Sequence, residues 1–102
     1  MKKGNDKKYI DEFKMYLLEL DSSNGTIETY ITGVHDFFTW INTKYLHDIA
    51  PTSVTAFDIR EYKTNITHNK NLKANTVNNK LAALKSFFNF LYEKKQINKN
   101  PA

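Results

Sequence analysis

The sequence predicts an all-α domain in which four helices form two helical hairpins. Four segments place apolar residues at the i, i+3, i+4 and i+7 spacing of an amphipathic helix, and no segment shows the alternation of a strand. Turn-forming residues separate these segments by short connections, as in a helical bundle. The chain of 102 residues, 40% hydrophobic and 14% aromatic, is long enough for one core and too short for two.

The first predicted hairpin follows a flexible N-terminal tail, residues 1–6. Its first helix runs from Lys7 to Leu20, and a turn over residues 21–25 is dense in capping residues. Its second helix runs from Thr26 to Lys44, with Phe37 and Trp40 at the flanks of its apolar face. The apolar positions of the two helices are Tyr9, Ile10, Phe13, Tyr16, Leu17 and Leu20, then Ile27, Ile31, Val34, Phe38 and Ile41.

The second predicted hairpin begins after a loop around Pro51, where a helix is disfavoured. Thr55 and Asp58 resemble a capping box, and the third helix covers about Ala56 to Ile66. A polar loop over residues 67–71 and an anchoring Leu72 precede the fourth helix, 74–94. The expected buried positions are Phe57, Ile59 or Tyr62, and Ile66, then Val77, Leu81, Leu84, Phe88 and Leu91.

An internal correspondence relates the two hairpins. The second helix matches the fourth at a spacing of fifty residues, from Thr26-Ile27 against Thr76-Val77 to Phe37-Phe38 against Phe87-Phe88. A weaker echo sets 10–13 of the first helix against 59–62 of the third. Two helix–turn–helix units of similar pattern, packed together, would explain both matches.

Positive charge is concentrated at the C-terminal third of the chain. Residues 70–102 carry seven lysines and one acid, a net charge of +6, whereas the whole chain carries +4. Such asymmetry indicates a polyanionic partner, nucleic acid before membrane. No apolar run approaches the roughly 18 residues of a membrane span, and no signal sequence is evident, so a cytoplasmic protein without membrane contact is expected.

The residues of catalytic and metal sites are largely missing from the sequence. Cysteine is absent, His35, His47 and His68 are scattered, and Arg60 is the single arginine. No glycine-rich phosphate loop and no distinctive carboxylate pair occur. We therefore expect a binding module, with no catalytic residues, metal, cofactor or small-molecule ligand.

The fourth helix carries the candidate DNA-binding face. Between Lys73 and Asn89 this helix has no acid, and small amide and hydroxyl residues alternate with lysine. Asparagine can bond the adenine edge, small residues permit close approach to a groove, and lysines meet phosphates. Thr26, Thr29 and Thr32 occupy the matching face of the second helix, a weaker candidate because Glu28 and Asp36 lie there too. The candidates on the fourth helix are Lys73, Asn75, Thr76, Asn78, Asn79, Lys80, Ala82, Lys85 and Ser86.

The whole pattern resembles the core-binding domain of tyrosine recombinases, the phage-integrase and Xer-like family. The similarity spans about residues 7–101 and rests on the order of several degenerate stretches. These are Thr26-Ile27-x-x-Tyr30, Phe37-Phe38-x-Trp40, Val54-Thr55-x-x-Asp58-Ile59-x-x-Tyr62, Thr76-Val77-Asn78-Asn79-Lys80-Leu81, Ala83-Leu84-Lys85-x-Phe87-Phe88-x-Phe90-Leu91 and Ile97-x-x-Asn100-Pro101.

The resemblance implies a four-helix SAM-like bundle whose second and fourth helices face the major groove of double-stranded DNA. On that basis residues 7–96 form the core-binding domain, and residues 97–102 are an exit strap towards a catalytic domain that this sequence lacks. In the family, a tyrosine of that domain attacks a phosphodiester with the help of two arginines, so a chain with one arginine is expected to be a non-catalytic part of a recombinase. Other recombinase protomers are expected partners. Family members often carry arginine where this chain has Asn79, Lys80 and Lys85, which puts the strength and base preference of binding in doubt.

Two interpretations of different class remain open from the sequence. The first is a DNA-binding module of a phage-type integrase. The second is a helical protein-interaction module whose basic face docks an acidic partner. Engagement of the fourth helix by duplex DNA alone discriminates between them.

Overall fold

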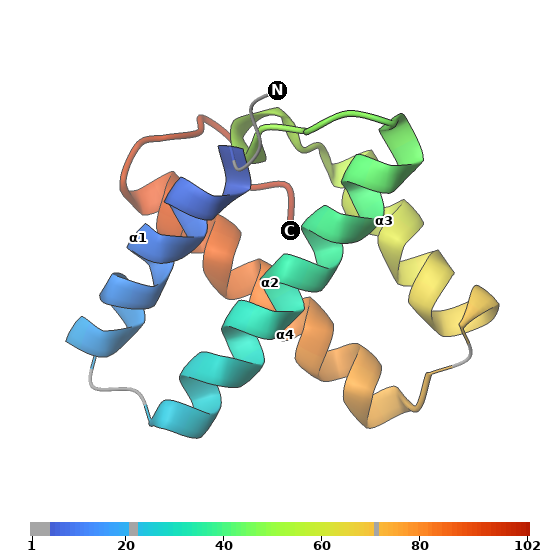
Figure 1. Cartoon of the computed structure of the whole chain (residues 1–102), viewed down its shortest axis with the longest axis horizontal. Coiled ribbons are helices and arrows are strands. Elements are labelled where there is room, and N and C mark those ends of the chain that lie inside the picture. The colour runs from blue at the N-terminus through green and yellow to red at the C-terminus, as the bar shows by residue number, and fades with distance from the viewer. Residues whose placement is uncertain (1–4, 21–22, 71) are drawn as a thin grey trace.

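Four α-helices make up most of the part of the chain that the structure describes (Figure 1). The computed structural model describes residues 5–20, 23–70 and 72–102, and this part of the chain contains no strand. The helices are α1, Asn5–Glu19; α2, Asn24–Tyr45; α3, Ala56–Thr64; and α4, Ala74–Glu93. A 3-10 turn, Pro51–Ser53, precedes α3, and a π-helical turn, Asn65–Asn69, follows it. The predicted all-α class and its two hairpins are confirmed.

The first two helices begin earlier than predicted. α1 starts at Asn5, so the last two residues of the predicted tail are helical, while residues 1–4 lie outside the described part. α2 starts at Asn24 because the Ser23 side chain accepts a hydrogen bond from the backbone N–H of Thr26, at 3.2 Å. This cap fixes the first turn despite Gly25 within it. Residues 21–22 of the predicted turn lie outside the described residues.

The polar loop predicted over residues 67–71 is wrong over residues 67–69, and residue 71 lies outside the described part of the chain. Residues 65–69 form a π-helical turn, closed by a 2.9 Å hydrogen bond from the Lys70 N–H to the Asn65 carbonyl. The N–H of Leu72 donates to the Ile66 carbonyl at 3.1 Å. The wider turn prolongs the helical segment beyond α3 while Ile66 stays 1% exposed, and Leu72 packs on the core as predicted.

The predicted capping box at α3 is present. The backbone N–H of Thr55 donates to Asp58 Oδ2 at 2.9 Å, and the N–H of Asp58 donates to Thr55 Oγ1 at 3.3 Å. The other carboxylate oxygen, Oδ1, accepts a 3.0 Å hydrogen bond from the Tyr45 hydroxyl at the end of α2. This bond raises the pKa of Tyr45 and ties the end of α2 to the start of α3.

The two hairpins are arranged about an approximate two-fold axis, vertical in Figure 1. α2 and α4 begin at the lower edge of that view and cross in the middle, while α1 and α3 lie to either side. The exposure pattern of residues 24–41 repeats in residues 74–91 at every position except Trp40 and its counterpart Phe90. The fifty-residue correspondence in the sequence therefore reflects a structural repeat.

Aromatic pairs in the core obey the same symmetry. Phe37 meets Phe88 edge-on with ring centroids 6.3 Å apart, and the equivalent pair of Phe38 and Phe87 is 5.9 Å apart. Phe13 of α1 meets Phe87 at 5.3 Å and 81°, which matches Tyr62 of α3 against Phe37 at 5.1 Å and 84°. Such edge-to-face pairs each add about 0.5–1.5 kcal/mol beyond the burial of their area.

Three predictions about burial are wrong. Leu20 and Phe57, expected to pack inside, are 58% and 54% exposed, because each lies at the end of a helix that its neighbours do not cover. Phe37, placed at the flank of the second helix, is fully buried because α2 is covered by α4 on one side and α3 on the other.

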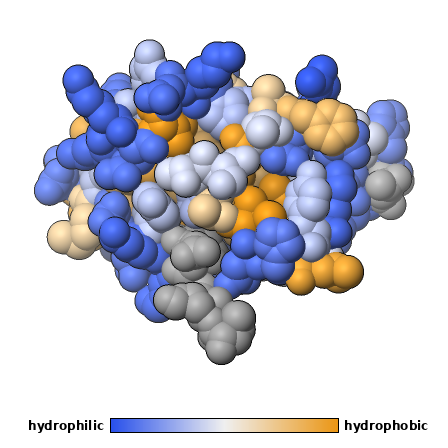
Figure 2. Space-filling view, turned by 90° about the horizontal axis from the view of Figure 1, so that it is seen from above, coloured by the Kyte–Doolittle hydropathy of each residue, from blue (hydrophilic) through white to orange (hydrophobic). Residues whose placement is uncertain are grey.

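Seen from above, the end of the molecule opposite the starts of α2 and α4 exposes hydrophobic side chains in separate areas between hydrophilic ones (Figure 2).

Candidate nucleic-acid interface

A shallow groove lies between the first halves of α2 and α4. Its walls are formed by Thr29 and Thr32 from α2 and by Thr76, Asn79 and Lys80 from α4. All five were candidate DNA-binding residues from sequence, and the structure brings them together in about 310 Å³ of space. The groove is lined mainly by short hydroxyl and amide side chains, which leave room for another molecule to approach the two helices closely.

The remaining candidates on α4 occupy its outer surface beside the groove. Lys73, Asn75, Asn78, Ala82 and Lys85 are exposed. Lys73 occupies the N-cap position of α4, where no side chain hydrogen-bonds to the first turn. The exposed start of α4 therefore offers backbone N–H groups and positive charge on one side.

Two further candidates are less available than the sequence suggested. Ser86 is half-buried. Thr26 is exposed, but its hydroxyl accepts a hydrogen bond from the Ser23 hydroxyl at 2.9 Å, so it takes part in capping α2.

Gly33, which was not among the candidates from sequence, sets how closely α2 and α4 approach. A Cβ built on Gly33 would lie 2.8 Å from the Cβ of Ala83, closer than side-chain carbons pack. These two residues are equivalent in the repeat, so the smallest side chains of both helices meet where the helices cross. In the sequence, the signal for this contact was a small residue at the same position of each helix, among larger apolar residues.

The electrostatics of the groove are mixed. Lys80 forms a 2.7 Å ion pair with Asp36 of α2, and its side chain is 20% exposed. Glu28, not among the candidate residues, also lines the groove. Lys80 is therefore partly neutralised, whereas the exposed lysines Lys73 and Lys85 keep the outer surface of α4 positive.

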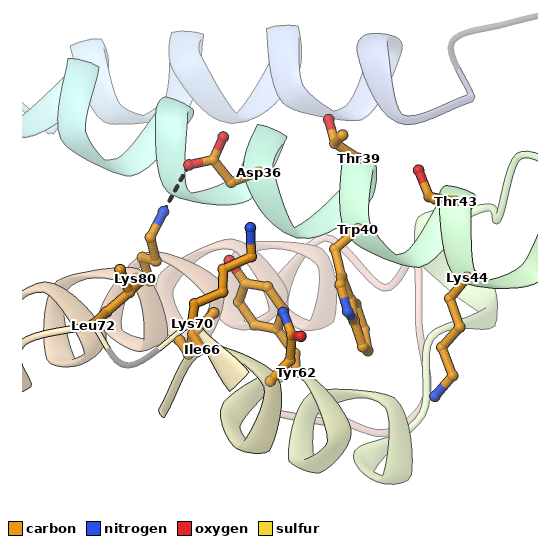
Figure 3. A pocket seen from close by; sticks show the side chains of 11 residues that line it. Asp36, Thr39, Trp40, Thr43, Lys44, Tyr62, Ile66, Lys70, Leu72 and Lys80 are labelled. Carbon is orange, nitrogen blue, oxygen red and sulfur yellow. Dashed lines mark hydrogen bonds and ion pairs between the residues drawn. The ribbon is translucent and has the colours of Figure 1, made fainter. Parts of the chain in front are cut away.

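A second groove, of about 540 Å³, adjoins the first and shares Lys80 with it. It runs between α2, α3 and the π-helical turn, over the apolar side chains of Trp40, Tyr62, Ile66 and Leu72 (Figure 3). Burial raises the pKa of Tyr62 to about 12, with a smaller contribution from Asp36, so the phenol is neutral at physiological pH. Trp40 was expected at the flank of an apolar helix face, and no open groove was predicted beside it.

The described residues contain neither a cluster suited to a metal ion nor a membrane-spanning helix. No group of three or more His, Asp or Glu side chains there is placed to hold a metal ion. Within the same residues, no helix is both long and apolar enough to cross a membrane.

Comparison with known proteins gives a consistent picture along nearly the whole chain. The family model described as "Phage integrase, N-terminal SAM-like domain" matches residues 10–95. Tyrosine recombinase XerC of Bacillus licheniformis is 33% identical over 99 residues, which cover 96% of this chain and 32% of the relative. XerC of Bacillus subtilis is 30% identical over 98 residues, which cover 95% of this chain and 31% of the relative. The TnP I resolvase of Bacillus thuringiensis is 28% identical over 83 residues, which cover 81% of this chain and 28% of the relative. The chain thus spans about a third of the length of these curated relatives, and no solved structure matches it.

Proposed function

Because the chain belongs to the family of phage integrase N-terminal SAM-like domains, we propose that it binds double-stranded DNA at the core site of a recombination reaction. In this proposal the chain is the non-catalytic, N-terminal clamp half of a tyrosine recombinase. The relatives named above are recombinases and a resolvase, and the chain matches about a third of each. The chemistry of strand cleavage and contacts with other protomers then belong to the full-length protein.

The observation that carries the proposal is the acid-free outer surface of α4 beside the groove. From Lys73 to Asn89 the helix contains three lysines and no carboxylate. Lysines at the edge of a surface of small polar residues suit phosphates on either side of a DNA groove. The start of α4 adds N–H groups and the positive end of a helix dipole, both favourable for a phosphate.

Base recognition is assigned to the groove between the helices. Asn79 can bond the N6 and N7 positions of adenine, and Thr76 can serve as donor or acceptor beside it. Thr29 and Thr32 face them from α2. Glu28 accepts hydrogen bonds only, so it favours bases that present an amino group, cytosine above all, and disfavours carbonyl edges.

An amide chemical-shift titration with a short duplex at low salt tests this interface. We expect shifts along Lys73–Asn89 and 26–32, because those residues approach the duplex. Lys85→Gln should weaken binding to every sequence and lower the slope of log affinity against log salt by about 0.9. Lys14→Gln removes the same charge from the exposed surface of α1 and should leave the slope unchanged.

Absence of shifts near millimolar protein would refute duplex binding by this domain. Equal effects of the two lysine substitutions would also refute it, because the affinity would then depend on net charge alone. Either result shifts the interpretation to a module whose basic surface docks an acidic protein.

A further inference from the structure

The groove over Trp40 differs from its counterpart in the other hairpin. There, the Tyr16 ring packs on Phe90 with centroids 4.8 Å apart, and Phe90 is only 4% exposed. In the repeat, Trp40 takes the place of Phe90, and Asn65 takes the place of Tyr16. The smaller Asn65 leaves Trp40 half-exposed beside the open groove. The space beside Tyr16 and Phe90 is correspondingly smaller, about 330 Å³ against about 540 Å³ beside Trp40, because an aromatic ring occupies part of it.

The charges around this groove favour an anion. Lys44, Lys70 and Lys80 line it together with a single acid, Asp36. Figure 3 shows Lys70 and Lys80 on one side of Trp40 and Lys44 on the other. Lys80 is paired with Asp36, and Lys44 with Glu61 of α3 at 3.4 Å, while Lys70 is exposed and carries the positive charge proposed to meet the anion. An occupant with a flat apolar part and a negative charge matches both the aromatic floor and the lysines.

The groove adjoins the proposed duplex interface, because Lys80 lines both. A DNA strand that leaves a duplex on the α2–α4 surface would reach this groove by passing Lys80 and its partner Asp36. Aromatic side chains beside lysines are the usual means of holding unpaired nucleotides, since every base has a flat face and every nucleotide a phosphate.

We propose that this groove holds an unpaired nucleotide of DNA, with its base against Trp40 and its phosphate near Lys70. The proposal rests on the proposed function for the duplex part of the DNA. It adds a second kind of contact to the domain: the α2–α4 surface holds paired DNA, and the Trp40 groove holds a nucleotide that has left the duplex.

Trp40 emission provides a direct readout, because Trp40 is the only tryptophan in the chain. Three DNAs are compared: a blunt duplex, the same duplex with a short thymidine overhang at either end, and the same overhang made of abasic sites. We expect the thymidine overhang to quench Trp40 and to bind about tenfold more tightly than the abasic overhang, because only the former can stack. The abasic overhang carries the same phosphates and so controls for charge.

Two substitutions test the groove itself. Asn65→Tyr introduces the ring found in the other hairpin and should abolish the preference for the thymidine overhang, with affinity for the blunt duplex unchanged. Lys70→Gln alters only an exposed side chain, so it should fold normally while weakening overhang binding several-fold. Lys63→Gln, an exposed charge on α3 that does not line the groove, is its matched control.

Equal affinity and quenching for thymidine and abasic overhangs would overturn the proposal, because charge alone would then explain binding. A change in Trp40 emission with protein concentration in the absence of DNA would overturn it too, in favour of a second copy filling the groove. A short thymidine strand separates this proposal from duplex binding. If it quenches Trp40 in the native chain but not in Asn65→Tyr, the groove site stands even where the blunt duplex fails to bind.

Discussion

The crossing of α2 and α4 at Gly33 gives the sharpest prediction of the structure. Gly33→Ala places a Cβ 2.8 Å from the Ala83 Cβ, whereas ordinary contacts of this kind lie at 3.4–4 Å. Neither group is the end of a flexible side chain, so the two helices must move apart. That movement strains the packing of the phenylalanines that meet between the two helices just beyond the crossing, Phe37 with Phe88 and Phe38 with Phe87.

The expected cost follows from two opposing effects. Overpacking a tight core contact destabilises by about 1–3 kcal/mol. Replacing glycine by alanine inside a helix stabilises by roughly 0.5–1 kcal/mol. We therefore expect Gly33→Ala to lower the free energy of unfolding by about 1–2 kcal/mol, although an exposed helix site would gain stability from the same change.

The reciprocal substitution isolates the contact. Ala83→Gly removes the opposing Cβ, so the double variant again has a single methyl group at the crossing. Urea unfolding followed by circular dichroism gives the four free energies of a double-mutant cycle. We expect a favourable coupling energy of about 1–3 kcal/mol, the overpacking cost that Ala83→Gly relieves.

Additivity of the two substitutions within about 0.5 kcal/mol would refute the close crossing, because residues that do not touch behave independently. A gain of stability in Gly33→Ala alone would do the same. The duplex-binding groove provides a second check, since its two walls belong to the helices that move. Gly33→Ala should weaken DNA binding while the protein is still fully folded.

Three further outcomes are expected. Asp58→Ala removes the capping box and the partner of the Tyr45 hydroxyl, and should lower the free energy of urea unfolding by about 1–2 kcal/mol; an unchanged value would contradict the role of Asp58. Tyr62 has a pKa of about 12 in the folded chain and about 10 when unfolded. Its stabilising contribution is therefore complete below pH 10 and is lost as the pH rises towards 12. The midpoint of urea unfolding should fall over that pH interval more steeply than in Tyr62→Phe. Asp36→Asn frees Lys80 and removes a carboxylate beside the groove. The affinity for duplex DNA and the dependence of that affinity on salt should therefore rise, while the free energy of unfolding changes by less than about 1 kcal/mol. Weaker DNA binding would show that Asp36 instead holds Lys80 in its binding position.

Local chemistry in the sequence was sufficient to predict the helices. The apolar spacing of the second and fourth helices predicted two long central elements, and the Thr55–Asp58 pair predicted the start of the third at Ala56, where α3 begins. The helix ends were less certain because they depend on single hydrogen bonds. Ser23 moved the start of α2, and the bond from Lys70 to Asn65 turned a predicted loop into a π-helical turn.

The candidate site was predictable in composition but not in geometry. Amide residues and lysines identified α4, but sequence spacing within one helix says nothing about what lies across from it. Lys80 is an example, because its pairing with Asp36 joins residues 44 positions apart. The groove beside Trp40 was likewise invisible, since it results from a side chain that is small in one hairpin and aromatic in the other.

Comparison of the two halves of the repeat separates the residues that maintain the fold from those that make the two surfaces differ. The positions that preserve the symmetry are buried: the phenylalanine pairs and the small residues at the crossing. Several positions that break it are partly exposed and, in one half of the repeat, line the proposed grooves. Lys80 corresponds to Tyr30, Asp36 to Ser86, and Asn65 to Tyr16. A symmetric core with asymmetric grooves is expected if the core is constrained by packing and the grooves by an asymmetric partner. Exchanging Tyr16 and Asn65 should therefore leave the helical content near that of the native chain while closing the groove over Trp40 and abolishing the nucleotide contact assigned to it. Loss of cooperative unfolding in the exchanged protein would instead mean that the asymmetry belongs to the packing of the core.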